Sequence, residues 1–152
     1  MDFKKLANQY RDELLDNVLP FWLEHSQDLE FGGYFSCLDR EGKVFDTDKF
    51  IWLQGREVWM FSMLYNKVEK RQEWLDCAVQ GGEFLKKYGH DGNYNWYFSL
   101  DRSGRPLVEP YNIFSYTFAT MAFGQLSLAT GNQEYADIAK KTFEIILSKV
   151  DN

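Results

Sequence analysis

Residues 50–65 read FIWLQGREVWMFSMLY, an almost uniformly apolar and aromatic stretch with a single arginine, Arg56, near its middle. The stretch predicts a helix that is hydrophobic on nearly every side, and such a helix must be surrounded by other elements rather than lie on a surface. Its few polar side chains either pair internally or face an enclosed cavity, because burying an unpaired charge is costly. The stretch therefore predicts an inner helix and makes Arg56 the first residue to explain.

The composition narrows the class of protein. At 152 residues the chain is long enough for one domain with an ordinary core, so residues 1–152 are expected to form a single domain. The formal net charge of -6 argues against nucleic acid or an anionic membrane surface as a partner, because either would require a clustered basic face. Apolar runs fall short of the ~20 residues of a membrane span, and Cys37 and Cys77 form no CxxC pair. We therefore expect a soluble, cytoplasmic protein.

Apolar residues recur at helical spacing in four further stretches, so five helices are expected along the chain. The additional helices are expected at residues 2–26, 72–88, 113–130 and 133–149. Pro20 lies inside the first stretch and should kink or break the helix there, because proline removes a backbone hydrogen bond. Gly89 and Gly131 stand directly after two of the stretches, where they suit helix C-terminal caps.

One pattern occurs twice between the expected helices. The first copy reads GYFSCLDREGKV and the second reads WYFSLDRSGRP, and in each an Asp-x-x-Gly turn separates two short extended runs. The pattern predicts two short β-hairpins, at Tyr34–Val44 and Trp96–Val108. A shift of 62 positions carries Asp39 onto Asp101 and the start of the second helix onto the start of the fourth. The chain therefore contains a repeat of helix, hairpin and apolar helix.

Neither copy of this unit can bury its apolar helix alone. Units of this kind must stack or close into a ring, with apolar helices inside and amphipathic helices outside. The expected fold is therefore all-α, an (α/α) toroid of helical hairpins with two short β-hairpins. Two and a half repeats fill only an arc of such a ring, so the toroid is expected to be incomplete, with no partners across the middle for its inner helices.

Three motifs resemble one known family. They are WLQGR at residues 52–56, WYFSLDR at residues 96–102 and EPYNIFS at residues 109–115. In this order and spacing they resemble the N-terminal part of the N-acylglucosamine 2-epimerase family, to which cellobiose 2-epimerases and aldose–ketose isomerases are related. The resemblance implies an (α/α)6 barrel that holds an opened sugar in its central cavity and inverts carbon 2 by removing and returning a proton. It implies no obligatory cofactor.

The resemblance also implies a pair of histidines on later inner helices that carry out the proton transfers. Imidazole suits this step because its pKa lies near neutral pH. The chain contains only His25, near the end of the first helix, and His90, in a loop after the third, and both are expected to be structural. We therefore expect an N-terminal piece of a sugar epimerase or isomerase, truncated before its catalytic residues and inactive by itself.

Three residues are candidates for binding a sugar. Arg56 matches the family's substrate-binding arginine, and its donors would hold a sugar hydroxyl or stabilise negative charge on the carbonyl oxygen. The alternative for Arg56 is a buried ion pair with a neighbouring carboxylate. Trp52 lies one helical turn before Arg56 and would stack on the sugar or pack in the core. Tyr116, on the fourth helix, would reach the cavity with its hydroxyl.

Other acidic residues point to structure, and no metal site is expected. Asp39 and Asp101 each begin an Asp-x-x-Gly turn, where a short acidic side chain binds nearby backbone amides. No cluster of His, Cys, Asp and Glu has the spacing of metal ligands.

Two other classes of protein stay open. Glycoside hydrolases on the same architecture use two carboxylates, and the inner helices offer only Glu57 as a candidate. A non-catalytic binding or assembly module would associate through the exposed inner-helix surface, because a large uncovered apolar patch tends to find a partner. For the same reason we expect a homo-oligomer, with a small-molecule sugar as its ligand.

Overall fold

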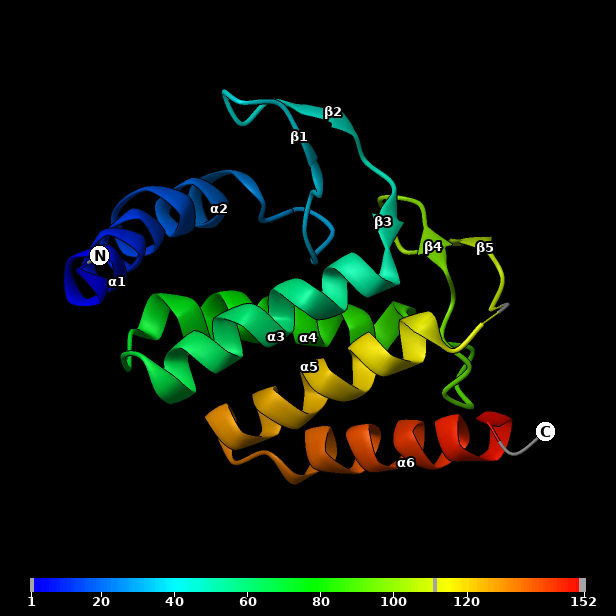
Figure 1. Ribbon diagram of the computed structural model, residues 1–152. Coiled ribbons are helices and arrows are strands. Elements are labelled where there is room, and N and C mark those ends of the chain that lie inside the picture. Colours follow the sequence, from blue (N-terminus) through cyan, green and yellow to red (C-terminus); the bar gives the residue numbers. More distant parts are fainter. Residues whose placement is uncertain (1, 111, 151–152) are drawn as a thin grey trace.

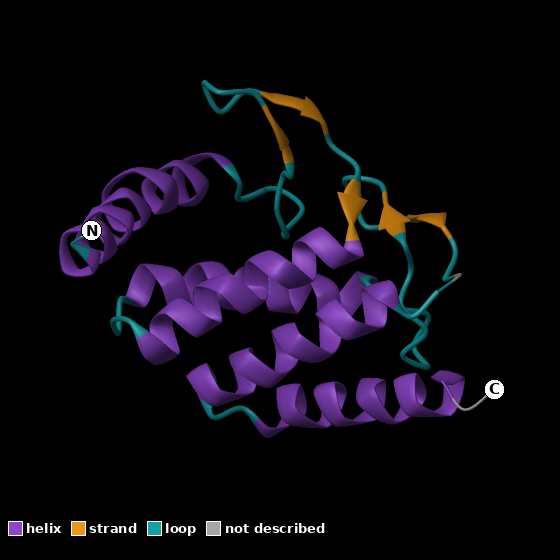
Figure 2. Cartoon of the chain, viewed as in Figure 1, coloured by secondary structure: helices purple, strands orange, loops and turns teal. Residues whose placement is uncertain are grey.

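The structure is a computed structural model that describes residues 2–110 and 112–150, and it is mostly helical (Figure 1, Figure 2). The helical elements are α1 (Phe3–Glu13), the π-helical turn η1 (Leu14–Val18), α2 (Leu19–His25), α3 (Ile51–Lys67), α4 (Gln72–Tyr88), α5 (Phe114–Thr130) and α6 (Gln133–Val150). The strands are β1 (Cys37–Leu38), β2 (Val44–Asp46), β3 (Lys49–Phe50), β4 (Ser99–Leu100) and β5 (Pro106–Val108). Tyr111, in the third motif, lies outside the described residues. The helical class and the predicted helices are confirmed.

The first predicted helix is interrupted, as its proline required. In η1 the N–H of Leu19 donates to the carbonyl of Leu14, five residues back, instead of four. Pro20 follows directly and has no N–H to donate to the preceding turn, so the α-helical pattern cannot run through this point unchanged. Regular hydrogen bonding resumes in α2, where Pro20 lies in the first turn and its missing donor does no harm.

The two hairpins repeat one another in their hydrogen bonds, which confirms the predicted pair. The N–H of Asp39 donates to the carbonyl of Lys43, and the N–H of Asp101 donates to that of Arg105. Gly42 and Gly104 occupy the same place in each turn and both have positive φ, 82° and 95°, which glycine adopts without strain. β1 pairs with β2, and β4 pairs with β5, in each case antiparallel. Each Asp is therefore a turn residue, as predicted.

β3 was not predicted. It pairs antiparallel with β4, so the second hairpin becomes a three-stranded sheet of order β3-β4-β5. Lys49 lies opposite Leu100, and Phe50 lies opposite Ser99. This pairing attaches the second hairpin to the residues that lead directly into α3.

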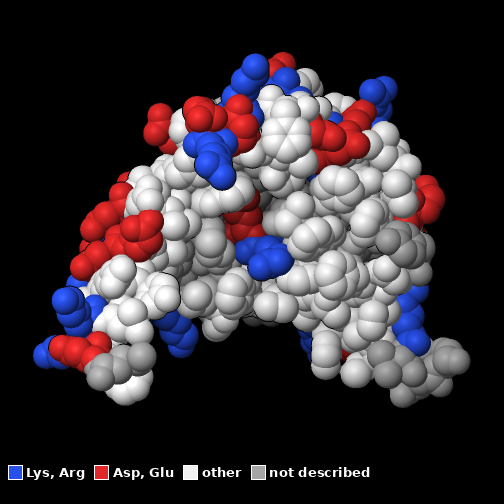
Figure 3. Space-filling model, turned by 45° about the horizontal axis from the view of Figure 1, so that its top comes forward, with Lys and Arg blue, Asp and Glu red and all other residues white. Residues whose placement is uncertain are grey.

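α3 is the central helix of the molecule. It packs against α4 and α5, and α5 packs in turn against α6. Gly55 permits the close contact of α3 and α5, because a Cβ atom there would lie 3.0 Å from the backbone of Phe118. Among the described residues, no helix is both long enough and apolar enough to cross a bilayer. The helices form an arch that is open on one side, visible in Figure 3, in agreement with the predicted arc.

A buried ion cluster holds the loops above the helices together. The ammonium of Lys49 is fully buried and donates to Asp28 at 2.9 Å, and the guanidinium of Arg102 also donates to Asp28 at 2.9 Å. Burial alone would raise the pKa of Asp28, but the hydrogen bonds from Arg102 and Lys49 lower it to about 2. The cluster joins the turn after α2, the start of β3 and the turn of the second hairpin.

Candidate functional site

Arg56 lies on an exposed side of α3 and not within the core. Its guanidinium carbon lies 5.9 Å from the ring centre of Trp52 and 5.8 Å from that of Phe118, in the range of cation–π contacts. No Asp or Glu among the described residues forms an ion pair with it. Among the described residues, Arg56 therefore does not form the buried ion pair that was its alternative role.

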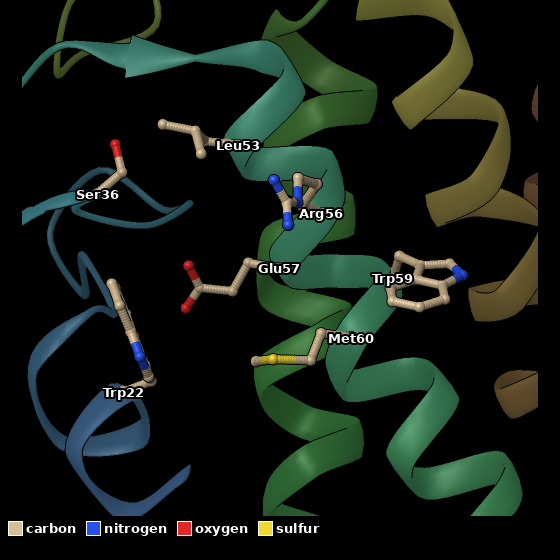
Figure 4. Close-up of a pocket in the computed structure, with 7 residues that line it drawn as sticks. All are labelled: Trp22, Ser36, Leu53, Arg56, Glu57, Trp59 and Met60. Carbon is tan, nitrogen blue, oxygen red and sulfur yellow. The ribbon is translucent and has the colours of Figure 1, made fainter. Parts of the chain in front are cut away.

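A pocket of about 310 Å³ opens beside Arg56. It is lined by Trp22 of α2, Ser36 just before β1, and Leu53, Arg56, Glu57, Trp59 and Met60 of α3. Figure 4 shows Arg56 and Glu57 extending into the space that Trp22 and Ser36 face from the other side. The space-filling view shows a hollow on this face with an acidic and a basic group next to each other (Figure 3). The walls are mainly apolar, so the polar groups in the pocket are few and converge.

Glu57 is the second charged residue of the pocket. Its Oε1 atom lies 2.5 Å from the hydroxyl oxygen of Ser26, which is itself fully buried. Burial raises the pKa of Glu57 to about 8, against the opposing effect of the Ser26 hydrogen bond. The sequence had singled out Glu57 only as an acid for a hydrolase. Its position next to Arg56 in an apolar stretch was the available signal that both side chains reach the same space.

Ser36 adds a third polar group. Its hydroxyl oxygen is buried and has no hydrogen-bond partner among the described residues. Buried polar groups are normally paired, so this unpaired hydroxyl in a residue that lines the pocket is unusual. Sequence reasoning missed Ser36, because a serine in a short extended run carries no signal of its own.

The other predicted binding residues are distributed differently. Trp52 lies beside Arg56 and also lines a second pocket of about 610 Å³ with Phe98, Asn112, Ile113, Phe114 and Thr117. Tyr116 is buried, and its hydroxyl donates to the side-chain oxygen of Asn95 at 3.2 Å. It does not line the pocket that contains Arg56. The structure thus brings Arg56 and Trp52 together and places Tyr116 in the core, so a role for Tyr116 in binding stays a prediction.

Neither histidine lines the pocket. The ring of His25 packs against Phe21 at the end of α2, with ring centres 4.9 Å apart. His90 stacks on Tyr94 at 4.8 Å and accepts a hydrogen bond from the backbone N–H of Gly92. Burial lowers the pKa of His90 below its ordinary value. Among the described residues no group of three or more His, Cys, Asp and Glu is placed to hold a metal ion.

Comparison with known proteins assigns the fold and motifs to a family. Residues 33–152 match the family model of N-acylglucosamine 2-epimerase (GlcNAc 2-epimerase). The chain belongs to the N-acylglucosamine 2-epimerase family. The N-acylglucosamine 2-epimerase of Mus musculus is 44% identical over 140 residues, which cover 90% of this chain and 33% of that protein. The chain therefore spans about a third (33%) of the length of this relative.

Other members of the family share the fold. The cellobiose 2-epimerase of Dictyoglomus turgidum is 29% identical over 148 residues, which cover 96% of this chain and 38% of that protein. The structure of a cellobiose 2-epimerase from Bacillus thermoamylovorans has a TM-score of 0.86 at 30% identity, covering 94% of this chain and 37% of that one. These cellobiose 2-epimerase structures are α/α toroids, so the predicted fold class is confirmed.

Proposed function

We propose that the chain supplies part of the sugar-binding cavity of a carbohydrate 2-epimerase or isomerase. The reaction would invert carbon 2 of an N-acylglucosamine or a related aldose by removing and returning the proton at that carbon. One observation carries the proposal. The guanidinium of Arg56, within a motif of this family, faces an open pocket without a carboxylate partner among the described residues.

The chemistry of this step explains why an unpaired arginine is useful. Removing the proton beside a carbonyl group leaves negative charge on the carbonyl oxygen, and a guanidinium stabilises that charge with paired donors. An arginine that already holds a carboxylate would lose most of this effect. The indole of Trp52 would pack against the apolar face of the sugar and hold it against Arg56. Tyr116 would take part only if its hydroxyl gave up its hydrogen bond to Asn95 and formed one to the sugar.

We propose no catalytic residue in this chain. His25 and His90 both pack against aromatic rings away from the pocket. The 152 residues by themselves would therefore bind a sugar without converting it. Residues 1–152 would form one domain-sized part of an (α/α)6 barrel.

The two alternative classes are less well supported. Hydrolysis of a glycoside usually takes two carboxyl groups about 5–9.5 Å apart, and among the described residues Glu57 is the only acidic one that lines the pocket. A role in assembly is compatible with sugar binding. The sequence pointed to the inner helices as the surface of self-association. We propose that copies of the chain associate instead through the exposed apolar side of α1, which carries Phe3 and Tyr10. The net charge of -6 argues against a nucleic-acid partner. The free thiols of Cys37 and Cys77 support a cytoplasmic location.

Sugar binding by the chain itself tests the proposal. The affinity for N-acetylglucosamine would be measured by calorimetry or by NMR titration for the wild-type chain and for Arg56→Ala. Losing hydrogen bonds from a charged donor should weaken binding by about 1.5–3 kcal/mol, roughly tenfold or more. Arg11→Ala is the matched control, because Arg11 is exposed on α1 and pairs only with its neighbour Asp12 among the described residues. Equal affinity of Arg56→Ala and wild type would refute the assignment of Arg56.

A further inference from the structure

Arg56 and Glu57 are consecutive residues of α3, and both extend into one pocket (Figure 4). A guanidinium and an ionised carboxylate that face the same pocket attract each other and can form charge-assisted hydrogen bonds. Nevertheless, the described residues include no ion pair between these two side chains. The carboxyl group of Glu57 is directed instead to the hydroxyl of Ser26, which directly follows α2.

The hydrogen bonds around Ser26 explain this arrangement. Its hydroxyl oxygen lies 2.6 Å from the carbonyl oxygen of Trp22 and 2.5 Å from Oε1 of Glu57. A hydroxyl has one hydrogen, and the carbonyl of Trp22 can only accept. Both short contacts are satisfied together when Ser26 donates to Trp22 and Glu57, in its protonated form, donates to Ser26. An ionised Glu57 would leave one of the two contacts without a hydrogen.

The surroundings of Glu57 favour the same state. The neighbouring polar groups, apart from Arg56, are hydroxyl and thiol groups that carry no charge at neutral pH. They are Ser26 directly after α2, Tyr34 and Ser36 of the segment before β1, and Cys77 of α4. The hydroxyl of Tyr34 donates to the backbone carbonyl of Cys77 at 2.7 Å, so it does not donate to Glu57. Burial raises the pKa of Glu57 to about 8, in agreement with the geometry.

We propose that Glu57 is held as a neutral carboxylic acid, which leaves the guanidinium of Arg56 free to bind a sugar oxygen. When Glu57 releases its proton to solvent, the carboxylate pairs with Arg56 and withdraws it from the ligand. Glu57 is thus a positioning residue that acts through Arg56. This inference rests on the proposed function, because it assumes that Arg56 is the group that binds the sugar.

The proposal fixes the direction of the pH effect. Glu57 is neutral below its pKa of about 8 and becomes ionised above it, so sugar binding is strong below this value and falls as the pH rises. Arg56 itself stays protonated throughout, because the pKa of a guanidinium exceeds ~12. A loss of affinity at alkaline pH therefore reports the ionisation of Glu57 and not a change in the charge of Arg56.

The first test needs no sugar. The carboxyl carbon of Glu57 would be followed by NMR through a pH titration of the 152-residue chain, together with the Nε–H signal of Arg56. The expected midpoint for Glu57 is about 8, and the Arg56 signal should change with the same midpoint. The change at Arg56 should vanish in Glu57→Gln. A midpoint near the ordinary glutamate value of ~4.3, or an Arg56 signal that ignores the titration of Glu57, would overturn the proposal.

The second test measures affinity for N-acetylglucosamine at about pH 6.5 and about pH 9.5, on either side of the Glu57 midpoint. Because ionisation changes tenfold per pH unit, the wild-type chain should lose at least about tenfold in affinity at the higher pH. Glu57→Gln, a neutral isostere, should bind equally at both values. Glu144→Gln, which changes an exposed glutamate of α6, should behave as the wild type does.

The outcomes separate this proposal from the proposed function. Binding of the sugar by wild type that is the same at both pH values overturns the role of Glu57 and leaves Arg56 as a ligand residue. Absence of sugar binding at either pH, combined with the expected joint titration of Glu57 and Arg56, refutes the proposed function. In that case the control of Arg56 by Glu57 is still supported.

Discussion

The guanidinium of Arg56 lies beside two aromatic rings, that of Trp52 on its own helix and that of Phe118 on α5. The ring of Trp52 contacts that of Phe118 with centres 6.0 Å apart and that of Phe114 at 5.6 Å. These contacts limit the positions open to the arginine, whose side chain lines the pocket. In the proposed function, Trp52 would therefore affect sugar binding both by direct stacking and by holding Arg56.

A substitution at Trp52 tests this arrangement. Trp52→Leu keeps an apolar side chain in the half-buried site but removes the aromatic face. The affinity for N-acetylglucosamine should fall by about 0.5–1.5 kcal/mol, the usual contribution of an aromatic contact. Calorimetric titration measures the loss, and Phe143→Leu, at an exposed position of α6, serves as the control. An unchanged affinity in Trp52→Leu would show that Trp52 is only a packing residue.

At the scale of elements, the loops above the helices are held together by charge rather than by the short strands. The strands have two or three residues each, so their hydrogen bonds alone are few. Lys49, which is buried, reaches Asp28 and the backbone carbonyls of Gly32 and Arg102. Asp28 and Arg102 are 74 residues apart in the sequence, and no local pattern relates them. The cluster sets the position of the segment that carries Ser36.

Removing the carboxylate of Asp28 should destabilise the fold. Asp28→Asn leaves the ammonium of Lys49 buried without its counter-ion, and breaking a buried pair in this way costs roughly 3–5 kcal/mol. The free energy of unfolding from urea denaturation at neutral pH measures this cost. Asp12→Asn, at an exposed ion pair on α1, should change stability by less than about 1 kcal/mol.

The same carboxylate should make the wild type sensitive to acid. The pKa of Asp28 in the folded chain, about 2, lies below the ordinary value of ~3.9. Its contribution to stability is therefore present above about pH 4 and is lost as the pH falls through about 2. Across this range the stability of the wild type should decrease more than that of Asp28→Asn. Parallel curves for the two proteins would contradict this role of Asp28.

At the scale of the whole molecule, the first helix has an exposed apolar side. None of the residues of α1 is buried, and the side chains of Phe3 and Tyr10 are 75% and 71% exposed. Leu6 lies between them on the same side of the helix and is also exposed. The stretch is strongly amphipathic, so its apolar side is suited to contact with another protein surface.

Self-association through this side can be measured directly. Tyr10→Glu places a charge on the apolar side of α1 and should shift the chain toward monomer in light scattering at micromolar concentration. Because Tyr10 is 71% exposed, the change should affect the stability of the monomer little. Asn8→Glu adds the same charge on the opposite side of α1 and should leave association unchanged. A wild-type chain that is monomeric throughout this range would rule out the proposed association.

The sequence by itself determined the helices, the repeat and the two hairpin turns. Each of these depends on contacts between residues close in sequence: the apolar spacing of a helix, the missing N–H of Pro20, and the turn bonds of Asp39 and Asp101. It also determined which stretch becomes the inner helix, since an apolar surface on every side admits no other place.

Only the tertiary structure decided the site. The pocket forms where α2 and the segment before β1 meet α3, and the carboxyl group of Glu57 contacts a hydroxyl 31 residues away in the sequence. The sequence identified Arg56 as a candidate, but it did not show whether a carboxylate pairs with the guanidinium. Tyr116 donates to Asn95, a contact that the sequence did not indicate, and its role in binding stays a prediction. Electrostatic partners are chosen by distance in space, and that distance is set by how the helices pack.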